Sequence, residues 1–272
     1  MIRDLVTPFA GLDPDQPGDR LVSQWRDKVV GPHAALFRSV EAWIDPADAG
    51  EALPGLVARR EELLSRAPRA RDAVRKAHEL LRRLLPDAGP VDAVVLAGLG
   101  KANGWATRVD DVPTLFLAVE HLPGPGFDVV LALHELLHVE HLRRAARDWP
   151  PDGFAADLFR EGLAVHVTTR LLPDIDASGH LWFAPGYHEW LARCRQQEPA
   201  LRRRAAAELG REEVAREWFA GGPDGRGELP GRCGYWLGRG LVGELMADTS
   251  LETALHWSLA EVSSKLRRLL AS

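Results

Sequence analysis

The sequence has few cysteines, because only Cys194 and Cys233 occur among its 272 residues. Neither has a second cysteine near it, so a disulfide framework and a cysteine-based zinc cluster are both excluded. A surplus of basic charge is also lacking, since 34 Lys and Arg stand against 39 Asp and Glu, for a net charge of −5. This balance argues against a protein that binds nucleic acid through a basic surface.

Long apolar segments are lacking as well. The longest mainly apolar stretch covers residues 127–139, is interrupted by charged and titratable residues, and falls short of the roughly 18 residues of a membrane-spanning helix. The N-terminal residues do not contain the apolar run of a secretory signal. We therefore expect a cytoplasmic protein with no membrane partner. Its 46% hydrophobic and 27% charged residues are typical of a globular chain with a substantial core.

The N-terminal third of the sequence has helical periodicity. Apolar residues recur at helical spacing over residues 20–44, with a break at Gly31-Pro32. A second pattern, rich in Leu, Arg and Ala, covers residues 56–85 and contains Pro68, which predicts either a kink or two helices. Acidic residues between the arginines favour a solvated amphipathic face over a nucleic-acid surface.

After residue 90 the pattern changes to short apolar runs rich in β-branched residues. Three of them predict strands, at residues 91–97, 104–109 and 113–119, which together form a small sheet. The glycine-rich segment 98–104 has neither of the two common phosphate-loop spacings, and no helical pattern follows it. We therefore predict a tight connection between strands at this segment.

The remaining sequence predicts helices. Residues 127–148 and 154–172 have helical patterns and are separated by a turn rich in Pro and Gly at residues 149–153. Two short helices at the C-terminus are predicted by capping boxes, namely Thr249-x-x-Glu252 and Ser258-x-x-Glu261.

These elements predict an α+β fold that is mainly α, with a small sheet before the long helix at 127–148. We expect a helical N-terminal part, residues 1–90, to pack on a core, residues 91–272. The length is compatible with one continuous domain of this kind.

The chemistry is concentrated in the helix predicted at 127–148, which contains His134-Glu135-Leu136-Leu137-His138, an HExxH motif. Residues i and i+4 share one face of a helix, so both imidazoles can bind one metal ion while Glu135 can hold a metal-bound water. Apolar residues surround the motif, and a polar cluster buried among them needs partners or a metal to offset desolvation. The alternative is a helix with two hydrogen-bonded histidines and a surface glutamate.

A zinc site requires a third protein ligand. The extended HExxHxxGxxH pattern is excluded, because His141 and Arg144 stand where it needs Gly and His. Glu161 lies on the next predicted helix, and nearly the same number of residues separates it from the turn as separates His138 from the turn. If the two helices fold back on each other at the turn, the two side chains would therefore lie at the same level along the helix axes. Asp157, one helical turn earlier, is the rival carboxylate.

Three further segments accompany the HELLH motif: the strand at residues 114–119, Glu161-Gly162-Leu163-Ala164, and Gly234-Tyr235-Trp236-Leu237-Gly238 with Leu241 and Val242. Together with the motif they resemble a bacterial family of predicted zinc-dependent proteases in the gluzincin superfamily. The resemblance runs from about Val91 to the last helices. It implies a gluzincin-like metallopeptidase core in which His134, His138 and Glu161 bind zinc and Glu135 is the catalytic base.

The same resemblance implies a mechanism. Zinc would lower the pKa of its bound water and polarise a peptide carbonyl, while Glu135 would take the proton of the water and pass it to the leaving amine. The oxyanion also needs a hydrogen-bond donor. Tyr235 lies in a resembling segment and is our first choice, ahead of Tyr187, with a packing role as its alternative. Arg239, one turn later, could assist or bind a substrate carboxylate.

We therefore expect a zinc-dependent hydrolase, a metallopeptidase whose partner is a peptide or protein substrate. An alternative from another class is a non-catalytic, zinc-stabilised binding or regulatory protein that keeps the site. Glu135 favours the enzyme, since a structural metal site does not need a base next to its ligand. A helical interaction module with a chance motif would bind no metal.

Overall fold

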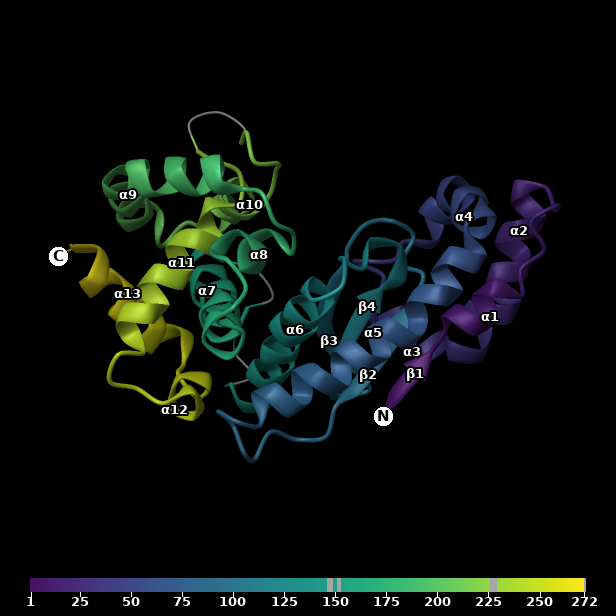
Figure 1. Cartoon of the computed structure of the whole chain (residues 1–272), viewed down its shortest axis with the longest axis horizontal. Helices are drawn as coiled ribbons and strands as arrows, with labels where there is room; N and C mark the ends of the chain where they lie inside the picture. The colour runs from purple at the N-terminus through teal and green to yellow at the C-terminus, as the bar shows by residue number, and fades with distance from the viewer. Residues whose placement is uncertain (146–148, 151–152, 226–228, 272) are drawn as a thin grey trace. The chain divides into compact units, whose positions relative to one another are not determined.

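The structure is a computed structural model that describes residues 1–145, 149–150, 153–225 and 229–271 (Figure 1). Its internal contacts divide the chain into two compact units, a first unit Met1–Leu142 and a second unit Arg143–Ser272. Within the described ranges helices predominate over a single four-stranded sheet, so the expected α+β, mainly helical class is confirmed. The boundary predicted at residue 90 falls inside the first unit.

The first unit contains a sheet with the strand order β1-β2-β4-β3. Its strands are β1 (Ile2–Asp4), β2 (Asp92–Leu96), β3 (Gly104–Val109) and β4 (Val112–Ala118). The first two pairings are parallel and the β3/β4 pairing is antiparallel. The three predicted strands are confirmed, and β1 was not predicted because three residues are too few to show an alternating pattern.

The helices of the first unit are α1 (Val6–Ala10), α2 (Gly18–Trp25), α3 (Ala34–Ser39), α4 (Ala49–Ala58), α5 (Arg60–Leu81) and α6 (Phe127–Arg144). In sequence, helices α1 to α5 lie between β1 and β2, and α6 follows β4. The predicted break at Gly31-Pro32 is confirmed, since a π-helical turn and a 3-10 turn connect α2 to α3 there. The second predicted helical region is two helices, but they separate at Arg59 and Pro68 lies inside α5.

Opposite faces of the sheet have different neighbours. Successive side chains of a strand point to opposite faces, so Phe116 and Leu117 of β4 face different ways. Phe116 stacks on Trp105 of β3 with ring centroids 5.1 Å apart, and Trp105 in turn stacks on Trp43. The other face, at Leu117 and Gly104, lies against side chains of α6.

The start of α6 is fixed to α5 by an ion pair. Asp128 is buried, and its carboxylate lies 2.8 Å from the Nε of Arg69. The other carboxylate oxygen accepts hydrogen bonds from the backbone N–H groups of Gly126 and Val129. A carboxylate at this end of a helix also interacts favourably with the helix dipole. These contacts hold the helix that carries the HExxH motif.

The glycine-rich segment after β2 is braced by a protein carboxylate. The buried side chain of Glu120 accepts hydrogen bonds from the backbone N–H of Gly98, at 2.8 and 3.0 Å, and of Gly100, at 3.0 Å. Backbone N–H groups that would face a phosphate in a phosphate loop are therefore occupied here. The segment does connect two strands, as predicted, but β2 and β3 are not neighbours, because β4 lies between them in the sheet.

The second unit is helical. Its elements are α7 (Phe154–Leu171), α8 (Ala177–Trp182), α9 (His188–Glu208), α10 (Ala215–Phe219), α11 (Cys233–Leu245), α12 (Leu251–Leu255) and α13 (Leu259–Ala271). The helix predicted at 154–172 is confirmed. Residues 146–148 and 151–152, which belong to the predicted end of the preceding helix and to the predicted turn, lie outside the described residues.

Two short helices close the chain, as the capping patterns predicted. At the start of α13, the Glu261 carboxylate accepts from the Ser258 backbone N–H at 2.8 Å, so this capping box is confirmed. The Thr249 box is wrong, because Ser250 caps α12 and accepts from the backbone N–H of Thr253 at 3.1 Å. Thr249 and Ser250 both have a side-chain hydroxyl that can cap a helix, so the sequence pattern alone does not show which of them is the cap. The residue at which the helix begins decides between them.

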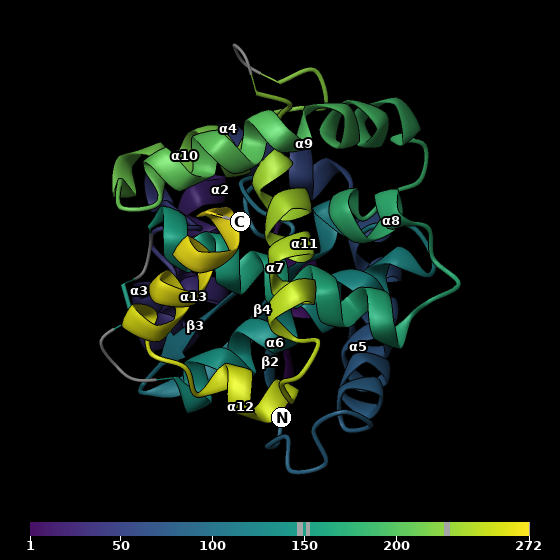
Figure 2. The same ribbon diagram turned by 90° about the vertical axis from the view of Figure 1, so that its left-hand side faces the viewer.

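Helices α7 and α11 of the second unit pack against each other at two glycines (Figure 2). A Cβ atom on Gly162 would lie 2.4 Å from the carbonyl carbon and oxygen of Gly238. A Cβ atom on Gly238 would lie 2.5 Å from the carbonyl oxygen of Leu158. Only glycine therefore fits at either position of this crossing.

Among the described residues, no helix combines the length and the hydropathy that crossing a membrane requires. The long helix α6 illustrates why, since it buries charged and titratable side chains among its apolar ones.

Candidate metal centre

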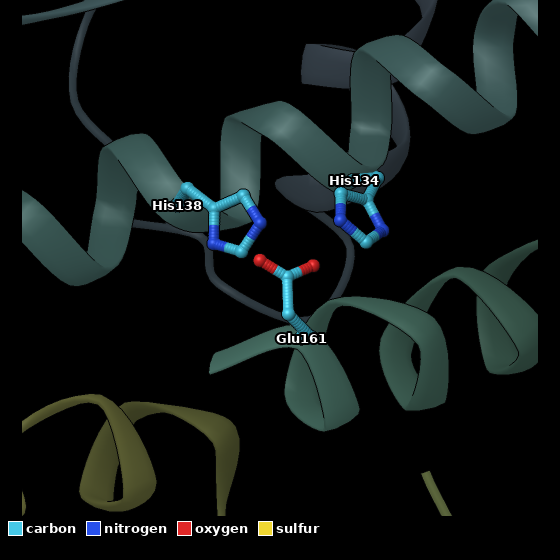
Figure 3. A group of neighbouring side chains, drawn as sticks. All are labelled: His134, His138 and Glu161. Carbon is cyan, nitrogen blue, oxygen red and sulfur yellow. The ribbon is translucent and has the colours of Figure 1, made fainter. Parts of the chain in front are cut away.

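Three predicted ligands come together in the structure. The side chains of His134, His138 and Glu161 each offer one ligand atom, and these atoms all lie within 4.8 Å of one another (Figure 3). We call these three residues the metal group. Two imidazoles and one carboxylate are a donor set that could bind a metal ion.

The two histidines are placed by the geometry of α6. Their positions four residues apart put both rings on one side of the helix, and Figure 3 shows the rings next to each other. Their centroids are 4.8 Å apart and their planes are 76° apart, so they do not stack. His134 is buried and His138 is half-buried. Imidazoles in this arrangement can point nitrogen atoms at a common ion.

Glu161 is placed by α7, directly before the glycine that contacts α11. The rival carboxylate, Asp157, has a different partner, because it lies 2.5 Å from a guanidinium nitrogen of Arg160. Burial raises the pKa of Asp157, and the adjacent Arg160 partly offsets this effect. Of the two candidate carboxylates, Glu161 is the one that belongs to the metal group.

The donor set fits a zinc ion. Structures with two His and one Glu are typical of catalytic zinc sites, in which a fourth position remains for water. Two ligand atoms at zinc-bond distance and tetrahedral angle are about 3.3 Å apart. The ligand atoms of the metal group all lie within 4.8 Å of one another. Imidazole and carboxylate ligands also suit other divalent transition metals, and the geometry of the group is not specific to zinc.

The predicted base, Glu135, is buried at 7% exposure between the two histidines in sequence. Its Cγ atom lies against β3, where a Cβ atom on Gly104 would approach it to 3.0 Å. The same Cβ atom would lie 3.2 Å from Leu117 and 3.3 Å from Leu131. Gly104 therefore leaves the space that the Glu135 side chain needs.

The predicted oxyanion donor, Tyr235, lies in the first turn of α11 and is half-buried. Its ring meets the edge of Phe219 at 5.2 Å between centroids, and the guanidinium of Arg232 lies 4.5 Å above it. These contacts hold the ring by aromatic and cation–π packing. Its role as a donor stays a prediction.

Two contributors to the site were missed by the sequence patterns. Gly104 was assigned to a strand and to the end of the glycine-rich segment 98–104, and its importance depends on α6 lying against that strand. Glu120 was not singled out, although its carboxylate shapes the loop that leads to Gly104. Neither residue is part of a motif, so the sequence contained no local pattern that could identify them.

Comparisons of this chain with models of protein families, with curated proteins and with solved structures gave no match. The resemblance to gluzincin-type proteases therefore stays a prediction from the motifs.

Proposed function

We propose that this protein is a zinc-dependent metallopeptidase that hydrolyses peptide bonds. The observation that carries the proposal is the buried carboxylate of Glu135, next to a metal group of two imidazoles and a carboxylate. A structural metal site has no use for a base directly beside its ligand in the sequence, whereas a hydrolytic metal site needs one. The alternative of a non-catalytic, zinc-stabilised binding protein does not require a base at position 135.

In this proposal His134, His138 and Glu161 hold the metal. When bound, zinc would lower the pKa of a coordinated water and polarise the substrate carbonyl. Glu135 accepts a proton from the attacking water and transfers it to the leaving amine. The apolar residues around the motif exclude bulk water, which strengthens every charge interaction of these side chains.

Metal content and peptide hydrolysis of matched variants test the proposal. We expect about one zinc per chain in the purified protein, measured by elemental analysis, and its loss in His134→Ala, His138→Ala and Glu161→Ala. Asp157→Ala is the control for Glu161→Ala, since both remove a carboxylate from α7. Zinc retention in Glu161→Ala together with its loss in Asp157→Ala would contradict the ligand assignment.

The Glu135→Gln variant distinguishes the proposed metallopeptidase from the alternative of a non-catalytic binding protein. This substitution preserves the shape of the side chain and removes the base, so zinc should be retained while the hydrolysis of a mixed peptide library falls by roughly 10²-fold or more. Glu140→Gln removes another buried carboxylate of α6 outside the metal group and should leave the rate nearly unchanged. A wild-type protein that binds zinc but cleaves no peptide of the library would favour the non-catalytic alternative.

A further inference from the structure

The second unit contains a cavity of about 290 Å³ that is lined by residues of α8, α9 and α11. Figure 2 labels these three helices. We call it the arginine pocket, because three arginines line it together with two glutamates and a tryptophan: Arg195, Arg202, Arg239, Glu198, Glu244 and Trp236. Its lining includes no residue of the metal group.

One of the three arginines is neutralised by the protein. The Nε atom of Arg202 lies 3.1 Å from the carboxylate of Glu198, one turn earlier on α9. The same guanidinium also pairs with the carboxylate of Glu244 on α11. Both acidic residues of the pocket are therefore engaged by this one arginine.

The other two arginines are not neutralised. Across the part of the chain that the structure describes, neither Arg195 nor Arg239 has a carboxylate or carbonyl partner. Burial, and next the positive charge of Arg195, lowers the pKa of Arg239. The charge of Arg239 also contributes to lowering the pKa of His166 and His180, for which burial is the larger cause. Two like charges therefore face one cavity whose two glutamates are both paired with Arg202.

We propose that the arginine pocket binds a small organic anion, with its carboxylate or phosphate oxygens held by Arg195 and Arg239 and its apolar part against Trp236. Planar guanidinium groups donate pairs of hydrogen bonds that match both kinds of oxyanion. With three arginines and two glutamates, the charged lining has a net charge of 3 − 2 = +1. An anion would relieve the repulsion between the two unpaired guanidiniums.

The apolar lining favours an organic ligand over a bare inorganic ion. Leu191 and Leu237 line the cavity beside Trp236. The volume is near the lower limit of the pockets that hold small molecules. A ligand with one charged group and one small ring or short aliphatic body would fill this space.

Calorimetric titration of the full chain with three ring compounds tests this proposal. Phenyl phosphate and benzoate carry the two candidate anions, and benzamide is neutral with the same ring. We expect both anions to bind and benzamide to bind at least about tenfold more weakly, since charged hydrogen bonds supply most of the affinity. Tighter binding of phenyl phosphate would identify a phosphate ligand, and tighter binding of benzoate would identify a carboxylate ligand.

Arginine variants locate the site. Arg195→Gln and Arg239→Gln should each weaken binding of the tighter anion by about tenfold or more, whereas Arg203→Gln should change it by less than about twofold. Arg203 is the matched control, because it is an exposed arginine of α9 outside the pocket. Arg195 is also exposed, so its variant is expected to fold even if the Arg239 variant is unstable. Failure of both anions to bind, or an equal loss in Arg203→Gln, would overturn the proposal.

Discussion

The two units each contain a glycine next to a residue of the candidate site, but the groups that these glycines approach differ. In the first unit, a Cβ atom on Gly104 would lie 3.0 Å from the Glu135 side chain. In the second unit, a Cβ atom on Gly162 would lie 2.4 Å from the backbone of Gly238. The first neighbour is a side chain that can rotate, and the second is the backbone of a packed helix.

Because of this difference, we expect a side chain at Gly104 to affect mainly catalysis and a side chain at Gly162 to affect mainly stability. A clash with a side chain is relieved by a shift of a few tenths of an ångström, so its cost is small and falls on the position of Glu135. A clash with a helix backbone requires the two helices to move apart, and every contact along their crossing is then weakened. The same substitution, glycine to alanine, should therefore have different consequences in the two units.

The largest effect is expected for Gly162→Ala. Because the added methyl group would meet the backbone of Gly238, we expect the free energy of unfolding to fall by about 4 kcal/mol or more. Since Glu161 directly precedes this glycine, zinc affinity should fall as well. Chemical denaturation and metal titration measure the two effects.

Gly240→Ala is the matched control for that substitution. It lies on α11, where an added Cβ atom would meet nothing within 4 Å. Alanine in an open helical position should be neutral or stabilising by roughly 0.5–1 kcal/mol. Equal stability of the Gly162→Ala and Gly240→Ala proteins would show that the helix crossing tolerates a side chain.

The next largest effect is expected on the rate of peptide hydrolysis, for a substitution at Tyr235 of α11, the helix that crosses α7. Tyr235→Phe removes one hydroxyl and keeps the ring that packs against Phe219 and Arg232. If the hydroxyl stabilises the oxyanion, kcat for a cleaved peptide should fall by roughly 10²–10³-fold with zinc content and melting temperature nearly unchanged. A lower melting temperature with a normal kcat would instead make Tyr235 a packing residue.

The elements around the site were predictable where the interactions are local. The HExxH spacing depends only on helical periodicity, and the strands at 104–109 and 113–119 depend only on alternation and composition. The choice of Glu161 over Asp157 also followed from counting residues along two helices. In the structure, the pairing of Asp157 with Arg160 gives an independent reason for the same choice.

What could not be predicted depends on non-local contacts. The short strand β1 exists because β2, about ninety residues later, offers a paired edge. Glu120 braces a loop that is distant from it in sequence by about twenty residues. Likewise, the unpaired charges of Arg195 and Arg239 are apparent only once α9 and α11 line one cavity. A single sequence contains no pattern that encodes such pairs.

A much smaller loss of stability than for Gly162→Ala is expected for Gly104→Ala, its counterpart in the first unit. The backbone of Gly104 is extended strand, so alanine is conformationally allowed there. Its methyl group would press on the side chains of Glu135, Leu117 and Leu131, at a cost of about 1 kcal/mol in the free energy of unfolding. Because Glu135 must move by a few tenths of an ångström, kcat should fall several-fold more than stability alone explains, with zinc content unchanged. Gly124→Ala, at a position with nothing within 4 Å, should leave both quantities as in the wild type. A Gly104→Ala protein that loses stability but keeps its full kcat would show that the space beside Glu135 serves packing alone.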